Sequence, residues 1–118
     1  MIKSIAVARR KKGMTHEEFI KYWHEVHAPL VKKIWPGLKK YVQNEIIVPE
    51  GQKREADGIV EMWYDSPEAM QKAMAWVQSP EGKPIRDDGD NFVDLTPGSG
   101  GGFWIVTENV VKDEISKK

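Results

Sequence analysis

Apolar residues recur along the chain at two spacings, one typical of strands and one typical of helices. Alternation over Ile2–Arg10 predicts a first strand whose second face carries only small side chains. Similar patterns predict strands over Leu38–Val48, Gly58–Tyr64 and Phe103–Asn109, the last extending as far as Val111 in its longest form. The segments between these strands follow a helical spacing or are rich in turn-forming residues.

Two helices are predicted between the strands. Thr15 and Glu18 have the spacing of a capping box, so the first helix begins here and continues to about Trp35, with a kink expected at Pro29. Ser66 followed by proline begins the second helix, and Ser79-Pro80 ends it before a short helical segment over Pro84–Phe92. Residues 96–102 are mostly glycine and proline, which predicts a mobile loop.

The order strand, helix, strand, strand, helix, strand is that of an α+β ferredoxin-like domain (βαββαβ). In such a domain a four-stranded antiparallel sheet is covered by helices on one face. The strands of this chain are apolar on both faces, as Ile59 and Trp63 on one side and Val60 and Met62 on the other illustrate. We therefore expect a second copy of the chain to cover the open face, giving a homodimer.

Length, charge and cysteine content narrow the class of protein. The 118 residues are enough for one domain, placed at residues 1–111 and followed by a charged tail at 112–118. With no cysteine, the chain cannot form disulfides, thiol nucleophiles or zinc ribbons, which suits the cytoplasm. A formal net charge of zero provides no basic surface for nucleic acid, and no apolar run approaches the length of a membrane span.

His27 is the main candidate for chemistry. It projects into the apolar half of the first helix, close to Trp23 and Leu30 in wheel order. A neutral imidazole in such surroundings can act as a general base. The alternative is a core histidine satisfied by a backbone carbonyl.

The other two histidines are weaker candidates. His24 lies one turn before His27 at the edge of the apolar arc, where it could contact a ligand. The three-residue spacing is not a metal-binding motif and no third ligand is evident, so no metal site is predicted. His16, in the first turn of the helix, is expected to be exposed.

Several strand residues are candidates for ligand binding. Arg9 could orient an anionic or carbonyl group, or pair with Glu61, which stands among apolar residues in the third strand. Trp23 and Trp63 could form apolar walls, although core and dimer packing is the commoner role for tryptophan. Asn44 is a further polar candidate.

Several segments closely resemble the EthD-domain family, and they span nearly the whole chain: Arg9–Arg10, Gly13–Phe19, Tyr22–Leu30, Pro36–Asn44, Asp57–Trp63 and Asp90–Asp94. The resemblance implies a dimeric α/β barrel in which each subunit keeps a pocket between its sheet and its helices. The family is named for a protein associated with alkyl-ether degradation. Its relatives include cofactor-independent lactone isomerases and fungal polyketide-tailoring dehydratases or decarboxylases, and its members are often described as oxidoreductases.

In the isomerase-like relatives a helix-borne histidine and a second-strand tyrosine line the pocket, and these correspond to His27 and Tyr41. The resemblance thus implies a small enzyme that needs no metal or organic cofactor and acts on a small hydrophobic molecule of aromatic, lactone or polyketide type. His27 would move the proton, and Tyr41 would hold an oxygen of the substrate. Two alternatives stay open: a non-catalytic ligand-binding or accessory dimer, and a haem- or oxygen-handling member of the wider barrel superfamily.

Overall fold

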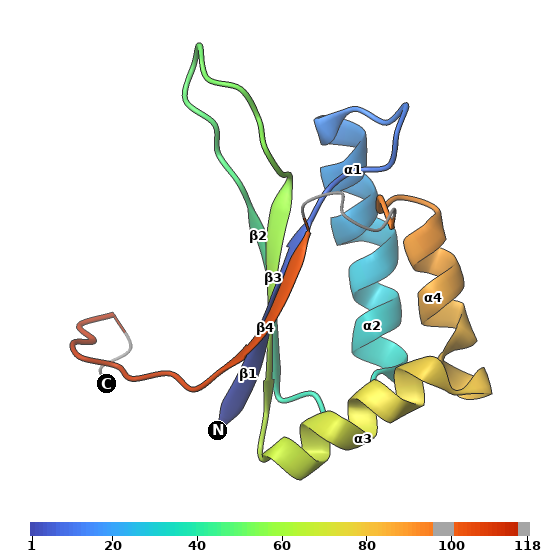
Figure 1. Cartoon of the computed structure of the whole chain (residues 1–118), viewed down its shortest axis with the longest axis vertical. Coiled ribbons are helices and arrows are strands. Elements are labelled where there is room, and N and C mark those ends of the chain that lie inside the picture. Colours follow the sequence, from blue (N-terminus) through green and yellow to red (C-terminus); the bar gives the residue numbers. More distant parts are fainter. Residues whose placement is uncertain (96–100, 116–118) are drawn as a thin grey trace.

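A computed structural model describes residues 1–95 and 101–115 of the chain. Its elements follow in the order β1 (Ile2–Ala8), α1 (His16–Tyr22), a π-helical turn (Trp23–His27), α2 (Ala28–Ile34), β2 (Lys40–Glu45), β3 (Gly58–Tyr64), α3 (Pro67–Gln78), a 3₁₀ turn (Pro80–Gly82), α4 (Lys83–Asp90) and β4 (Gly102–Val106). The strands form one antiparallel sheet in the order β2-β3-β1-β4. All the helices lie on one side of this sheet, and the opposite face, called the open face below, carries no helix (Figure 1). The α+β ferredoxin-like prediction is confirmed.

The capping box at the start of α1 is present as predicted. The Glu18 amide donates to the Thr15 hydroxyl at 3.0 Å, and the Thr15 amide donates to the Glu18 carboxylate at 2.8 Å. The kink expected at Pro29 takes the form of the π-helical turn, in which the Ala28 amide donates to the Trp23 carbonyl, five residues back. This change of register lies next to Pro29, which has no N–H to give the α-helical acceptor.

The core lies between the helices and the inward face of the sheet. Met62 and Tyr64 of β3 are buried against Val31 of α2 and Met70 of α3. A second cluster joins Phe19, Trp23 and Phe92, whose rings contact one another at tilted angles. Together these clusters fix α1, the π-helical turn and the end of α4 over one end of the sheet.

Three strands are shorter than predicted, because the alternation of apolar and polar residues continues past the last residues that pair with a neighbouring strand. β1 ends at Ala8, β2 covers only Lys40–Glu45 and β4 ends at Val106. Residues 96–100 of the predicted mobile loop and 116–118 of the predicted tail lie outside the described part of the chain. In that described part, no helix has the length and apolar character needed to cross a bilayer.

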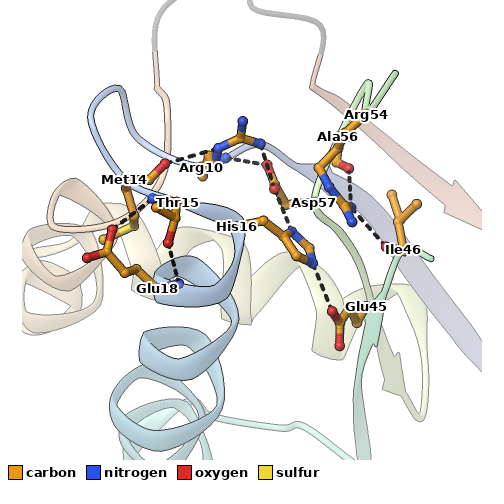
Figure 2. A network of polar contacts seen from close by, with 10 residues as sticks. All are labelled: Arg10, Met14, Thr15, His16, Glu18, Glu45, Ile46, Arg54, Ala56 and Asp57. Carbon is orange, nitrogen blue, oxygen red and sulfur yellow. Dashed lines mark hydrogen bonds and ion pairs between the residues drawn. The ribbon is translucent and has the colours of Figure 1, made fainter. Parts of the chain in front are cut away.

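His16 is buried, not exposed as its position in the first turn suggested. Its Nδ1 lies 2.7 Å from Asp57 Oδ1 and its Nε2 lies 2.8 Å from Glu45 Oε2 (Figure 2). Asp57 also accepts hydrogen bonds from the backbone amide and the guanidinium of Arg10. This network connects the end of β1, the start of α1, the end of β2 and the segment before β3.

Candidate functional site

A cavity of about 350 Å³ lies between the sheet and the helices. On the sheet side, β1 contributes only Ser4, Ala6 and Ala8, whose small side chains leave the space open. On the helix side, Trp23, His27 and Val31 close the cavity. The other residues that line it are Trp35, Tyr41, Val60, Met62, Met74, Val77, Gln78, Phe92, Val93 and Phe103. Most of these side chains are apolar, so a ligand here would be recognised by burial and by a few polar groups.

His27 occupies the cavity wall at the end of the π-helical turn. Its Nδ1 lies 2.7 Å from Asp88 Oδ2, and its ring packs on Phe92 with the centroids 4.9 Å apart. Both partners of the pair are largely buried, with side-chain exposures of 14% for His27 and 11% for Asp88. A carboxylate can only accept, so Nδ1 carries the proton and donates a hydrogen bond to Asp88. In the neutral ring with this tautomer, Nε2 has the lone pair that a general base requires.

Asp88 lies on α4, and a second hydrogen bond, donated by Tyr22 of α1, holds its carboxylate in place. The Tyr22 hydroxyl donates to Asp88 Oδ1 at 2.5 Å, and the Asn91 amide donates to the Tyr22 oxygen at 3.0 Å. The hydrogen bond to Asp88 raises the pKa of Tyr22, with a smaller contribution from burial. Asp88 is therefore a fixed acceptor that sets the orientation of the His27 ring.

Asp88 was not among the residues predicted from sequence, although a signal was present. It stands three residues after Ile85 and four before Phe92, both of which are buried. At helical spacing this puts a carboxylate on the apolar face of the short helix. Such a residue needs a buried partner.

Tyr41 faces the same cavity from β2. Its hydroxyl oxygen accepts a hydrogen bond from the Gln43 amide at 2.9 Å, and that amide also donates to the Trp23 carbonyl at 3.0 Å. Burial raises the pKa of Tyr41 to about 12, partly offset by the hydrogen bond from Gln43. The phenol therefore keeps its proton at neutral pH and can donate it to an oxygen of a ligand.

Trp23 lines the cavity, and its position depends on a glycine. A Cβ atom at Gly58 would lie 2.4 Å from Trp23 Cζ3 and 2.5 Å from its Cη2. Real side-chain contacts do not become this short. The six-membered part of the indole thus packs directly on the β3 backbone.

His24 does not line the cavity. Its Nδ1 lies 2.6 Å from Gln43 Oε1, and its ring stacks on Trp23 at an interplanar angle of 15°. It instead lines an outer groove between α2 and the chain leading into β2. His24 and His27 thus have different hydrogen-bond partners.

Besides His24, four predicted ligand contacts lie away from the cavity. Asn44, Glu61 and Trp63 project from the open face of the sheet, and Arg9 follows β1 in the same alternation. Their placement in the helix–sheet pocket is therefore corrected, because neighbouring residues of a strand point to opposite faces.

The proposed pairing of Arg9 with Glu61 is also wrong. Glu61 Oε2 accepts from Lys3 Nζ at 2.9 Å, and Glu61 Oε1 accepts from Asn44 Nδ2 at 3.2 Å. The hydrogen bond from Lys3 is the largest cause of the lowered pKa of Glu61, with burial opposing it. Arg9 Nε is buried without a hydrogen-bond partner among the residues described.

Residues that could hold a metal ion do not gather anywhere in the described ranges 1–95 and 101–115. No group of three or more His, Asp or Glu side chains there has a suitable arrangement. The chemistry that the geometry offers is a histidine base, a phenol donor and an apolar cavity.

The fold and the site define an α+β ferredoxin-like domain with a His–Asp pair at an apolar helix–sheet cavity. Comparison with known families makes this more specific. The EthD domain model matches residues 11–96, so the chain belongs to the EthD family. A search of curated protein sequences finds no significant match.

Three solved structures illustrate the similarity. An EthD family protein from Bacillus halodurans is 27% identical with a TM-score of 0.67, the alignment covering 92% of this chain and 99% of that one. A dimeric protein of unknown function with a ferredoxin-like fold from Bacteroides fragilis is 9% identical with a TM-score of 0.58, covering 89% and 93%. A mutant form of a cofactor-independent oxygenase from Streptomyces nogalater is 10% identical with a TM-score of 0.58, covering 95% and 97%. The last two similarities establish a shared fold.

Proposed function

We propose that this protein is a cofactor-independent enzyme that moves a proton on a small hydrophobic molecule bound in the helix–sheet cavity. The substrate class is an aromatic, lactone or polyketide-like compound with a carbonyl group, and the reaction is an isomerisation or elimination. The observation that carries the proposal is the His27–Asp88 pair at 2.7 Å, with His27 in the wall of a cavity that Tyr41 also lines. Membership of the EthD family is consistent with a small-molecule enzyme.

The chemistry follows from the protonation states of the two groups. His27 Nε2 takes a proton from a carbon next to the carbonyl, and the electron pair of the C–H bond moves to form an enolate. The Tyr41 hydroxyl donates a hydrogen bond to the enolate oxygen. In an unsaturated substrate the enolate is conjugated, and return of the proton from His27 to the γ carbon gives an isomer. In a substrate with a leaving group on the β carbon, the enolate electrons expel that group, which takes the proton from His27 and gives an elimination product.

Deuterium exchange tests this proposal without knowledge of the natural product. Unsaturated lactones and aryl ketones are incubated with the protein in D₂O, and loss of the C–H signal beside the carbonyl is followed by proton NMR. We expect Tyr41→Phe to slow the enzyme-dependent exchange by about 100-fold, the typical cost of losing one donor to a developing oxyanion. Tyr64→Phe is the matched control. The buried Tyr64 hydroxyl accepts a hydrogen bond from Trp35 Nε1 at 2.9 Å, and Tyr64 does not line the cavity. Equal rates in Tyr41→Phe and wild type would contradict the role of Tyr41.

The predominantly apolar lining supports a second candidate, a non-catalytic ligand-binding or accessory dimer. Binding of panel compounds without any exchange would favour it. Oxygen uptake during the same incubations would indicate oxidation chemistry instead, as in the Streptomyces nogalater oxygenase. We also propose a cytoplasmic location, which the absence of cysteine supports.

We propose that two copies of the chain pair through the open face of the sheet. This face carries Ile5 beside Trp104, and 54% of Trp104 is exposed in the single chain. Lys3 and Lys40 stand over the Trp63 ring on the same face, with Nζ 4.7 and 4.6 Å from its centroid. The Bacteroides fragilis protein of the same fold is described as dimeric, which supports a dimer here.

Sedimentation velocity at micromolar concentration checks the dimer. We expect a species of twice the 13.5 kDa chain mass, and Ile5→Asp should shift it to the monomer by placing an unpaired charge in the interface. Val26→Asp is the control, because Val26 is 45% exposed on the helix side. A monomeric wild type would refute the pairing.

A further inference from the structure

We propose that the natural ligand of the cavity is an organic anion whose acidic group lies outside the cavity, in the groove beside Lys32 and Lys39. The inference rests on the proposed function and specifies its substrate class: an apolar body in the helix–sheet cavity, joined to a carboxylate in the groove.

The groove and the cavity adjoin. The groove has a volume of about 550 Å³, and its lining includes His24, Lys32, Trp35, Lys39 and Tyr41. Trp35 and Tyr41 line the cavity as well. A ligand that passes these two aromatic side chains would be buried at one end and open to solvent at the other.

The electrostatics of this edge are positive although the whole chain is neutral. From Val26 to Asn44 the sequence carries four lysines and no aspartate or glutamate. In the part of the chain that the structure describes, Lys32 forms no ion pair, and Lys39 lies 3.4 Å from Asp65, with both side chains more than half exposed. Two ammonium groups thus line the outer hollow, and the carboxylate paired with Lys39 is itself more than half exposed to solvent.

The two hollows differ in the chemistry they can bind. The cavity offers mainly carbon surface and cannot solvate a charge, so an acidic group placed there would lose its hydration. The groove is wet and cationic, so the same group would keep its water and gain attraction from Lys32 and Lys39. Tyr41 lines both hollows, so its hydroxyl is the polar group that would donate to an oxygen of a ligand spanning them.

Isothermal titration calorimetry with 2-naphthoate and its neutral amide, 2-naphthamide, tests the inference. The two probes share an apolar body and differ in the charge of one group. At low salt we expect wild type to bind the carboxylate about fivefold more tightly than the amide, which is the combined effect of two exposed ion pairs. The preference should shrink in 0.5 M salt, where exposed charges are screened to about 4–5 Å.

The double variant Lys32→Gln/Lys39→Gln should abolish this preference and leave binding of the amide unchanged. The matched control is Lys33→Gln/Lys40→Gln, which removes the same charge from the neighbouring positions, neither of which lines the groove. An equal loss in the control would show a general field effect and overturn the proposal. Equal affinity of wild type for the two probes would overturn it as well.

Failure of the proposed function gives a different result. Ala6→Leu fills the cavity and should weaken both probes alike, since Ala6 lines the cavity and not the groove. If Ala6→Leu does not fold, NMR contacts between the naphthyl ring and the methyl groups of Val31 and Val60 locate the probe instead. Probes bound in the cavity without a carboxylate preference overturn the anion inference alone. Probes that bind elsewhere, or neither probe binding, overturn both the inference and cavity binding.

Discussion

His27→Ala is expected to lower the rate of enzyme-dependent deuterium exchange by about 10²–10⁴-fold, the usual contribution of a positioned general base. The reason is that His27 supplies the basic nitrogen at the cavity wall, with its other nitrogen committed to Asp88 at 2.7 Å. Tyr64→Phe is again the control, because Tyr64 lines neither the cavity nor the groove. A His27→Ala protein that exchanges at the wild-type rate would remove the basis of the mechanism.

Asp88→Asn distinguishes a positioning role from a purely structural one. An amide can donate to Nδ1, which would leave the proton on Nε2 and block the base. We expect a loss close to that of His27→Ala, up to about 10⁴-fold, as for an Asp→Asn change that fixes the wrong tautomer of a catalytic histidine. The pH profile of the remaining exchange should also shift, a change that simple loss of packing would not produce. An unchanged pH profile with normal thermal stability would argue against the positioning role.

Asp57→Asn is expected to destabilise the fold by about 3–5 kcal/mol, because it breaks a buried charge network and leaves Arg10 and His16 without their shared carboxylate. Asp57 is 1% exposed and accepts from Arg10 at 2.8 and 2.9 Å. Thermal unfolding followed by circular dichroism should show a Tm lower by roughly 10–20 °C. Asp87→Asn makes the same change at an exposed ion pair with Lys83 and should leave the Tm almost unchanged.

The same network gives a stability that depends on pH. Burial would raise the pKa of Asp57, but hydrogen bonds from His16 and Arg10 outweigh it and hold the pKa below the ordinary value of 3.8. A carboxyl group with a lowered pKa in the folded state stabilises the protein above its unfolded pKa and loses that contribution as pH falls. Wild type should therefore lose stability below about pH 4, and Asp57→Asn should lose less over the same range. Identical acid sensitivity in both proteins would contradict this assignment.

Local signals predicted most of the fold. The Thr15 capping box, the Ser66 cap and the alternation in β3 each depend on residues near one another in sequence, and all appear in the structure. The site was predicted in part for the same reason: His27 and Tyr41 stand on the cavity side of their elements. Strand parity excludes Asn44 from the cavity that Tyr41 lines, because three residues along a strand reverse the face.

The remaining errors concern contacts between distant segments. His27 meets Asp88 across 61 residues of sequence, and His16 meets Asp57 across 41. Local patterns do not identify these partners, because each pairing depends on how α4 and the segment before β3 come to lie beside the first helix. The open-face pair of Glu61 with Lys3 is of the same kind.

The direct packing of Trp23 on the backbone at Gly58 has a consequence for comparing relatives. A methyl group at position 58 would drive the indole out of its place, so one absent carbon helps to set how large a molecule this member of the family can admit. A homologue with alanine or a bulkier residue there can retain a chamber of this shape only by carrying a smaller side chain where this protein has Trp23. Reading the two positions as a pair should sort family members by the size of the molecules they take.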